Sequence, residues 1–264
     1  MSKLAEYALG IEEVAAAIAV AGIPEAAKGL LVSNFGRLSA DEERGRLLSA
    51  NHSLYARGLL TVSDHHPQLI PDLTRIVTVF TSNTRSLRMG KTSVFGEDVL
   101  AYYHDQDGWV KHAIRDGVAH YFTLNKAPGE MEAEIFEFFS PSFKAWSSIQ
   151  PIELPDTLFA DLDPRQRRSQ NDVLAFIHKT SPAHPSAELL SADLAQARLR
   201  GSMLWLEQIS EDDLATRGTL LIQGLDRLWM LNSKAEGEIS RLVAQLATYE
   251  QFKLNIHDFV PAST

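Results

Sequence analysis

Cysteine is absent from this 264-residue sequence. Its absence excludes a disulfide framework, a thiol nucleophile and thiolate metal sites. Long apolar runs are also lacking, since the most apolar early stretch, residues 14–22, is too short to span a bilayer. Met1 to Lys3 are not followed by the apolar middle and small-residue cleavage site of a signal peptide. We therefore expect a cytoplasmic protein with no membrane insertion.

Basic residues are fewer than acidic residues. Lys and Arg number 25 against 34 Asp and Glu, which gives a formal net charge of −9 at pH 7. Nucleic-acid binding relies on clustered Lys and Arg that neutralise phosphates, so the composition argues against a nucleic-acid partner. The apolar share of 45% is that of an ordinary soluble globular chain. A chain of this length can bury one large core or two medium ones.

Familiar catalytic motifs are missing as well. The sequence has no G-x-S-x-G elbow, no G-x-x-x-x-G-K-[ST] loop, no G-x-G-x-x-G turn and no H-E-x-x-H helix. We predict a protein that is not an enzyme and that needs no cofactor and no metal. An enzyme with a dispersed Ser-His-Asp site remains an alternative, because geometry rather than sequence order defines such a site.

Histidines provide the nearest approach to a metal site. Adjacent residues on an extended segment point in opposite directions, so we interpret His65 and His66 as an exposed loop rather than a chelating pair. His104, His112 and His120 fall on neighbouring predicted strands, where cross-strand ligand pairs can form. For these three we favour ordinary polar positions on an open sheet face.

An internal repeat is the clearest positive feature. Residues 117–131, GVAHYFTLNKAPGEM, resemble residues 224–239, GLDRLWMLNSKAEGEI, when Ser233 is treated as an insertion. The first glycines of the two copies, Gly117 and Gly224, lie 107 residues apart. Apolar and polar residues alternate in each copy, which is typical of a strand with one buried face. A turn with glycine precedes each strand, so each copy is predicted to end a hairpin.

Further strands and helices surround both copies. Predicted strands at 99–103, 109–114 and 118–124 make one antiparallel meander, and those at 203–206, 219–222 and 225–231 make a second. Apolar residues then change to helical spacing in both copies: Met131, Ile135 and Phe138 in the first, and Ile239, Val243 and Leu246 in the second. Both patterns predict a helix that covers the sheet.

The first 60 residues predict three helices. They span residues 9–21, residues 24–35, and a segment opened by the capping box Ser39-Ala40-Asp41-Glu42. Residues 71–80 fit a helix or a strand equally well, and residues 86–95 look extended.

Three helices followed by strands resemble a winged helix, in which Arg44, Arg46 and Arg57 would line one helix face. Residues 1–80 hold seven Lys or Arg against nine Asp or Glu, so we favour a solvated helix surface there.

The second half follows a proline-punctuated connection over residues 141–164. A helix at 165–179 and another from Ser186 through Leu199 lead into the second meander. Each half thus places helices before an antiparallel meander and one helix after it. The predicted fold class is α+β, with two similar halves, residues 1–150 and 151–264, related by pseudo-twofold symmetry within one compact unit.

Side chains on the meanders are the candidates for partner binding. Trp109, Lys111 and Tyr121 lie on the strands of the first meander, and we predict that they contact a protein partner. Tyr121 alternates with the apolar positions and is the better surface candidate. Trp229 takes the place equivalent to Phe122 on the apolar face and is predicted to pack in the core.

Three features deserve comparison with known families: the helix end Ser53-Leu54-Tyr55-Ala56-Arg57-Gly58-Leu59-Leu60, the hairpin Asp107-Gly108-Trp109, and the duplicated sheet-plus-helix halves. Together they resemble the EspG family of cytosolic chaperones from type VII (ESX) secretion systems. The resemblance implies a quasi-twofold α+β fold with a central antiparallel sheet. It also implies a chaperone that binds the helical tip of secreted heterodimers. The histidine-rich loop at 64–67 and the proline-rich connection are atypical, which suggests a distant relative with another client.

We therefore predict a non-enzymatic cytosolic chaperone or adaptor for a protein client, which binds by strand addition or by docking a client helix on an open sheet face. Homodimerisation stays open. The alternative from another class is a transcriptional regulator, with residues 1–95 as a winged-helix module and the remainder as an effector or dimerisation domain. A basic face on the helix at 41–57 would favour the regulator, and an apolar or acidic exposed sheet face would favour the adaptor.

Overall fold

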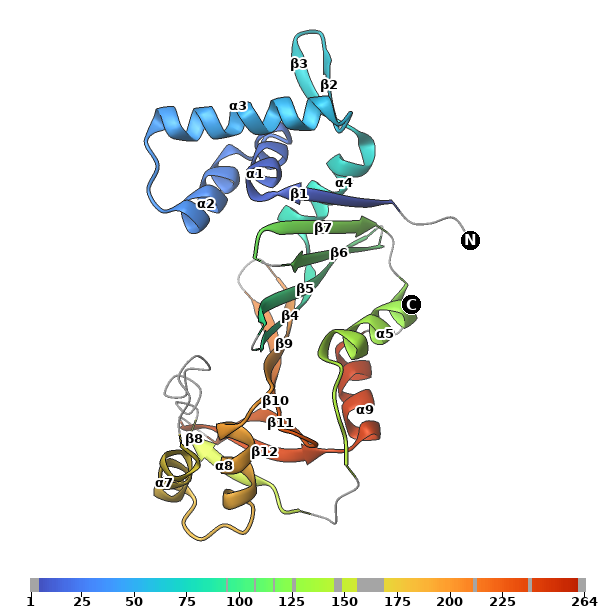
Figure 1. Ribbon diagram of the computed structural model, residues 1–264. Helices are drawn as coiled ribbons and strands as arrows, with labels where there is room; N and C mark the ends of the chain where they lie inside the picture. Colours follow the sequence, from blue (N-terminus) through green and yellow to red (C-terminus); the bar gives the residue numbers. More distant parts are fainter. Residues whose placement is uncertain are drawn as a thin grey trace. The chain divides into compact units, whose positions relative to one another are not determined.

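The computed structural model describes residues 5–93, 95–106, 108–115, 117–124, 127–144, 149–155, 169–210, 213–236 and 239–260. Helices and antiparallel strands make up this part of the chain, which confirms the predicted α+β class (Figure 1). Several predicted features lie outside the described residues: Asp107, Asp116, Asn125, Lys126, residues 163–168 and residues 237–238. None of the helices in the described ranges combines the length and apolar character that crossing a bilayer requires.

The chain forms two compact units. Unit 1 comprises Met1–Ser86 and Leu100–Lys126, and unit 2 comprises Leu87–Val99 and Ala127–Thr264. Strands β4 (Arg85–Ser93) and β5 (Gly96–Asp105) contribute residues to both units. The division into similar halves at residue 150 and their pseudo-twofold symmetry stay predictions.

The described residues of unit 1 contain four helices, and the strands predicted from the sequence follow them in the predicted order. Its further elements are β1 (Glu6–Gly10), α1 (Ile11–Val20), α2 (Pro24–Phe35), α3 (Ala40–Ala56), β2 (Leu60–Ser63), β3 (His66–Leu69), α4 (Pro71–Ser82), β6 (Gly108–Arg115) and β7 (Ala119–Leu124). Its sheet has the strand order β1-β7-β6-β5. The three predicted N-terminal helices are confirmed, and the ambiguous segment after Pro71 is a helix.

Local signals explain where the helices of unit 1 begin. Ser39 is the N-cap of α3, where its hydroxyl accepts a hydrogen bond from the Glu42 N–H, and the Glu42 carboxylate accepts one from the Ser39 N–H at 2.8 Å. This is the predicted capping box. Pro24 and Pro71 occupy the first turns of α2 and α4, where a missing N–H removes no helical bond.

The core of unit 1 lies between its sheet and the helices α1 and α4. The sheet contributes alternate residues of β5, β6 and β7, including Tyr103, Val110 and Phe122. Buried side chains of α1 and α4 pack on them: Val14, Ile18, Leu73, Ile76 and Val77. We call this side of the β5-β6-β7 sheet the inner face. The residues between them along each strand, among them Lys111 and Tyr121, point to the opposite side.

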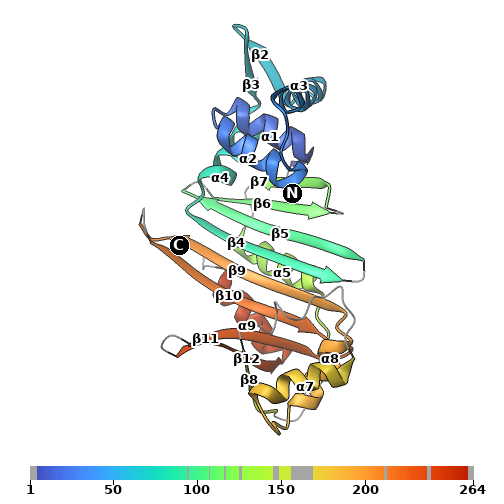
Figure 2. The same ribbon diagram turned by 90° about the vertical axis from the view of Figure 1, so that its left-hand side faces the viewer.

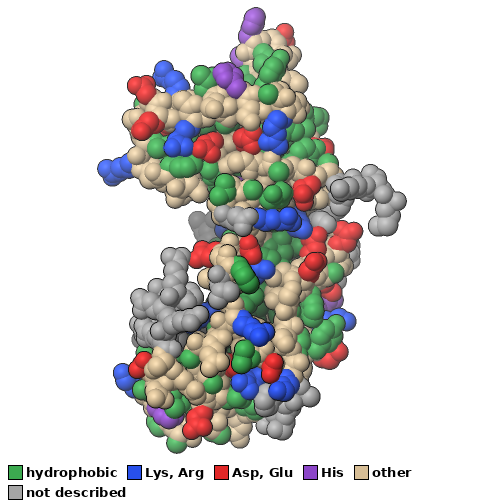
Figure 3. All heavy atoms as spheres, in the orientation of Figure 1, with side chains coloured by type: hydrophobic (Ala, Val, Ile, Leu, Met, Phe, Trp, Pro, Cys, Tyr) green, Lys and Arg blue, Asp and Glu red, His purple; other side chains and the backbone are tan. Residues whose placement is uncertain are grey.

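The strands β2 and β3 form a separate hairpin after α3. Asp64 and His65 make its two-residue turn with φ of 50° and 65°, and both are exposed. Asp and His tolerate this left-handed region better than most residues, and two such residues give the turn that suits a hairpin twist. Figure 3 shows histidine side chains at the surface of this hairpin. The predicted loop is therefore the tip of a hairpin, and His66 starts its second strand.

Unit 2 holds the second meander. Beyond the residues of β4 and β5, it contains α5 (Pro128–Phe139), β8 (Ile152–Pro155), α7 (Gln170–Thr180), α8 (Ala187–Ala195), β9 (Leu199–Gln208), β10 (Leu214–Gln223), β11 (Leu228–Glu236), β12 (Ile239–Ala247) and α9 (Tyr249–Phe259). Its strand order is β4-β9-β10-β11-β12-β8.

Helices pack on both faces of the sheet in unit 2. On one face α7 and α8 cover the β11 and β12 end, where Trp229 is fully buried as predicted, against residues such as Ile177 and Leu190. On the other face α5 and α9 pack against each other, with the Phe136 and Phe252 rings 5.8 Å apart. Figure 2 shows α7 and α8 at one end of the sheet, and among the described residues no helix covers β4, β9 and β10 on that face; we call it the uncovered face.

Two helix predictions in this unit are wrong. The segment Ile239–Ala247 is a strand, not a helix, because it pairs along its length with β11 and also with β8. Leu242 and Ala244 alternate toward the α7 and α8 layer, a period-two pattern that coexists with the helical spacing. The helix after Ser186 ends at Ala195, and Leu199 begins strand β9.

Candidate functional site

The three predicted partner-binding residues share one face of the unit 1 sheet. Trp109 and Lys111 lie on β6, and Tyr121 lies on β7 opposite Ala113, diagonal to Lys111. Tyr121 is half-buried, and the Arg115 guanidinium sits 4.7 Å from its ring centre. Lys111 is also half-buried. The structure thus places an aromatic ring and two cations on adjacent strands.

Trp109 differs from the other two in its exposure. Its relative exposure is 6%, and its ring packs against His104 with centroids 4.5 Å apart. Tryptophan is a frequent anchor at protein interfaces, but only the part of the ring that reaches the surface can contact a partner. Contact of these three residues with a partner stays a prediction, for which Tyr121 and Lys111 offer more accessible surface.

The interpretation of His112 and His120 as polar positions on an open sheet face is wrong. Both lie on the inner face, with relative exposures of 4% and 7%. His112 Nε2 and His120 Nδ1 are 2.9 Å apart, which is hydrogen-bond distance. His104 points to the opposite face beside Trp109. Among the described residues no group of three or more His, Asp or Glu is placed to hold a metal ion.

The winged-helix alternative requires that the arginines of α3 and its C-cap be available to DNA. Arg46 pairs with Glu12 of α1 at 2.7 Å, and Arg57 pairs with Glu13 at 2.9 Å. Arg57 also donates to the backbone carbonyl of Ala8. Burial raises the pKa of Glu13, but hydrogen bonds from Ser53, the Gly10 N–H and Arg57 outweigh burial, so its pKa is lowered. Two of the three arginines of a DNA-reading face are thus engaged with the protein itself.

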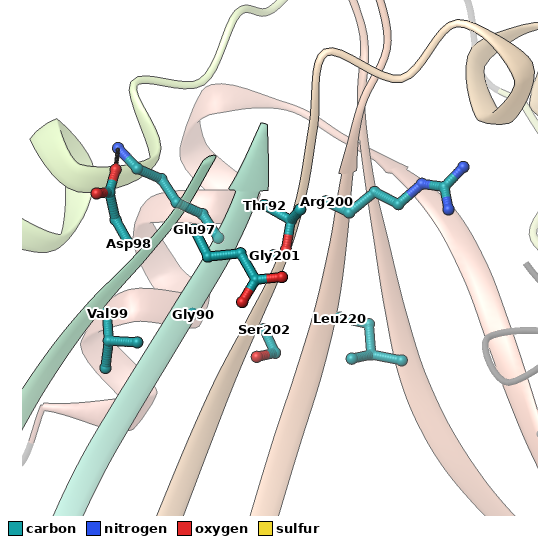
Figure 4. Close-up of a pocket in the computed structure, with 10 residues that line it drawn as sticks. Gly90, Thr92, Glu97, Asp98, Val99, Arg200, Gly201, Ser202 and Leu220 are labelled. Atoms are coloured by element: carbon teal, nitrogen blue, oxygen red, sulfur yellow. Dashed lines mark ion pairs between the residues drawn. The ribbon is translucent and has the colours of Figure 1, made fainter. Parts of the chain in front are cut away.

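The uncovered face of the unit 2 sheet carries a shallow groove of about 280 Å³ (Figure 4). It is lined by Gly90, Lys91, Thr92, Glu97, Asp98, Val99, Arg200, Gly201, Ser202 and Leu220. Ser202 lies directly opposite Leu220 in the β9 and β10 register, and both are half-buried. Small residues, Gly90 and Ser202, form the floor of the groove. They lie side by side, since a Cβ added to Gly90 would be 3.7 Å from Ser202 Oγ.

Charged side chains form the rim of this groove. The Glu97 carboxylate points over the floor, whereas Arg200 extends away toward α8, where it donates to the Leu194 carbonyl at 3.2 Å (Figure 4). Lys91 pairs with Asp98 at 3.4 Å and donates to the Phe138 carbonyl at 2.8 Å. The groove therefore offers hydroxyl and carboxylate groups around an apolar patch, a surface suited to side chains of a bound protein segment.

No residue of this groove was predicted from the sequence. The signal that was available is the glycines inside strand patterns, Gly90 in β4 and Gly201 in β9, since an isolated strand glycine often marks a close approach. The close approach is real on the far side of the sheet: a Cβ on Gly201 would lie 2.7 Å from the Phe139 ring. In the sequence-based prediction Gly201 fell between the helix expected through Leu199 and the strand expected at 203–206, so it was not placed inside a strand.

A second, more polar pocket of about 350 Å³ lies between β10, β11 and α9. Thr219 is 2% exposed and donates to Asn232 Oδ1 at 2.7 Å. Arg217 donates to the Asp258 carbonyl near the end of α9 and stacks over the Phe259 ring. The Arg217 contacts hold α9 against the sheet, and the Thr219 hydrogen bond joins β10 to β11. The polar groups of this pocket therefore have a structural role in unit 2.

Comparison with known proteins identifies the fold. No protein-family model matches the chain, and no curated protein matches it. Fourteen chains of solved structures match. One of these structures is the type VII secretion system chaperone EspG5 of Mycobacterium tuberculosis, in complex with a PE25-PPE41 dimer. Its TM-score is 0.64 and its sequence identity 11%, over 98% of each chain. The predicted resemblance to EspG is confirmed at the level of the fold.

Proposed function

We propose that this protein is a non-enzymatic chaperone or adaptor that binds a protein client in the cytoplasm. The observation that carries the proposal is a fold match along 98% of both chains to a chaperone that was solved with a bound protein dimer. The uncovered sheet face of unit 2, with its groove, supplies a surface on which a client segment docks. A helix is the form of client segment that we favour, because an amphipathic helix binds readily in an apolar groove.

Docking on the sheet face is favoured over strand addition. Strand addition needs free backbone groups on an edge strand. Outside the β2-β3 hairpin, the edge strands are β1 in unit 1 and β8 in unit 2. The Ala8 carbonyl of β1 accepts a hydrogen bond from Arg57 at 2.6 Å, and the Glu153 carbonyl of β8 accepts one from the Ser181 hydroxyl at 2.6 Å. Side chains thus occupy acceptors that an added strand would use.

The experiment that tests the proposal is a pull-down from native lysate with tagged protein, with and without nuclease treatment. We expect a protein partner that is retained after nuclease treatment. A Ser202→Arg variant, which places a long cation on the groove floor, is expected to weaken client binding at least tenfold, about 1.4 kcal/mol. Tyr121→Ala tests the predicted surface of unit 1 in the same assay.

The matched control is Leu254→Glu on α9, since Leu254 is 62% exposed and lies outside the groove. It is expected to retain the client fully. Each variant is also melted, so that lost binding is compared only between folded proteins. Loss of every partner on nuclease treatment would move the function to α1, α2 and α3. Equal binding by Ser202→Arg and wild type would remove the groove from the client surface.

A further inference from the structure

Two histidines form a hydrogen-bonded pair inside unit 1 that the proposed function does not use. His112 on β6 lies opposite Phe122, and His120 on β7 lies opposite Ile114, so the two rings meet on the diagonal. Their nitrogens are 2.9 Å apart and the ring planes differ by 12°. Aromatic side chains enclose His112, with the Phe122 ring stacked at 4.5 Å and the Phe80 ring edge-on at 5.4 Å.

The other ionisable groups around this core have partners of their own or are uncharged. Tyr103 of β5 stacks on His112. Asp72 of α4 accepts from Tyr7 of β1, and Arg75 of α4 pairs with Asp105 of β5. On α1, Glu13 is bonded to Ser53 and Arg57, and Glu12 is paired with Arg46. Burial lowers the pKa of His120, with no charged neighbour contributing.

Proton counting shows what the pair can hold. In the neutral pair one ring N–H donates to the bare nitrogen of the other ring. One added proton can go to an outer nitrogen and keep this hydrogen bond, although it places a charge in an apolar core. A second added proton puts N–H against N–H at 2.9 Å and two positive charges side by side. The rings must then separate, and the packing of β6 and β7 against α4 changes with them.

We propose that the His112 and His120 pair is a pH-sensitive switch, which holds the inner face of unit 1 together near neutral pH and loosens it in mildly acidic solution. Near neutral pH the hydrogen-bonded pair and the rings of Phe80 and Phe122 form one packed cluster. Proton uptake by the pair opens the cluster and lowers the local stability of β6 and β7. The inference is independent of the identity of any client.

The test is hydrogen exchange followed by mass spectrometry at pH 7.5 and pH 5.5, corrected for intrinsic exchange rates. An unfolded histidine titrates near pH 6.5, so each histidine that stays neutral in the folded state weakens protection about tenfold over this range. We expect a loss of ten- to a hundredfold in β6 and β7, and little change in β10 and β11 of unit 2. The variant His112→Gln with His120→Asn keeps amide groups near the paired nitrogens and cannot titrate, so it should remove most of the loss in β6 and β7. A smaller pH response remains from His104 of β5, whose pKa is lowered by burial and by the nearby Arg85.

The matched control is His52→Gln on the exposed surface of α3, which should keep the wild-type pH response. Equal pH responses in wild type and the double variant would overturn the proposal. If the double variant does not fold, the wild-type protein still decides the matter through NMR titration of its histidine ring signals. Two rings that titrate independently near pH 6.5, without spectral change elsewhere in the core, would also overturn it.

Discussion

Removal of the Asp193 carboxylate is the sharpest test of how unit 2 is held together. Asp193 lies on α8 with 3% relative exposure. Its Oδ2 accepts from Arg227 Nε at 2.6 Å and from Trp229 Nε1 at 2.8 Å, and its Oδ1 accepts from Arg227 Nη2 at 2.9 Å. The Arg227 guanidinium thus makes a bidentate interaction with both carboxylate oxygens. The hydrogen bond to Asp193 raises the pKa of Arg227. This one side chain fixes α8 to β11.

The expected cost of Asp193→Ala follows from what it leaves behind. Removing one partner of a buried ion pair costs about 3–5 kcal/mol, because the other charge stays desolvated and loses that partner's attraction. Arg227 keeps a weaker attraction to Asp226. The Arg227 side chain is 17% exposed, so water reaches part of it and the lower end applies. The Trp229 N–H also loses its acceptor. We expect a loss of about 3 kcal/mol, which in a chain of this size lowers the melting temperature by roughly 6–12 °C.

The assay is urea unfolding followed by tryptophan fluorescence and by far-ultraviolet circular dichroism. Glu188→Ala is the matched control, since this exposed carboxylate lies on the same helix and its loss should cost under about 1 kcal/mol. Gly224→Ala should displace the Asp193 carboxylate without removing it, because an added Cβ would lie 2.2 Å from Asp193 Oδ1. A cost for Asp193→Ala no larger than that of Glu188→Ala would refute the reasoning.

Two further perturbations probe the packing of each unit. Gly201→Ala should destabilise unit 2 by about 1–3 kcal/mol in urea unfolding, because its Cβ would press on the Phe139 ring and on the Gly90 carbonyl; Gly218→Ala, with contacts no closer than 3.6 Å, is its milder counterpart. Glu13→Gln should remove part of the acid sensitivity of unit 1. The lowered pKa of Glu13 means that its contribution is present above pH 4.5 and is lost as the pH falls further. A wild-type stability curve that the substitution leaves unchanged between pH 5 and pH 3 would contradict this role.

Local signals were sufficient to predict most helices and strands. The capping box at Ser39, the prolines at the starts of α2 and α4, and strict alternation in β6 and β7 all act within a few residues. Such signals need no knowledge of the rest of the fold. Strand β1 was missed because five residues that lead directly into α1 add only Leu9 to the buried core, and Leu9 also fits a helix start.

Strand β12 shows where local reasoning ends. Its sequence satisfies a helical spacing through Ile239, Val243 and Leu246 and a strand spacing through Leu242 and Ala244. The choice between them is made by partners far away in the sequence, since β8 pairs with β12 from about 90 residues upstream. Periodicity alone cannot rank two patterns that a segment satisfies equally.

The histidine pair and the groove were missed for different reasons. Alternation along β7 already places His120 on the same side as Phe122, so the pattern itself indicated burial. The prediction of an exposed position followed instead the general tendency of histidine to lie at the surface. The burial of His112 could not be predicted in this way, because its position opposite Phe122 is known only from the strand register. The groove depends on residues of β4, β5, β9 and β10 whose neighbours only the sheet order reveals.

The placement of the cations adds a point that composition cannot supply. Arg46, Arg57 and Arg227 are each paired with a carboxylate of the same chain, which neutralises the positive charge locally. Lys91 pairs with Asp98 and also donates to the Phe138 carbonyl, and Arg200 donates to the Leu194 carbonyl. The basic groups left for an external phosphate backbone are therefore fewer than the count of Lys and Arg suggests. This placement of the cations supports the proposed protein client over a nucleic-acid partner, because an external phosphate backbone needs clustered Lys and Arg that are not already neutralised.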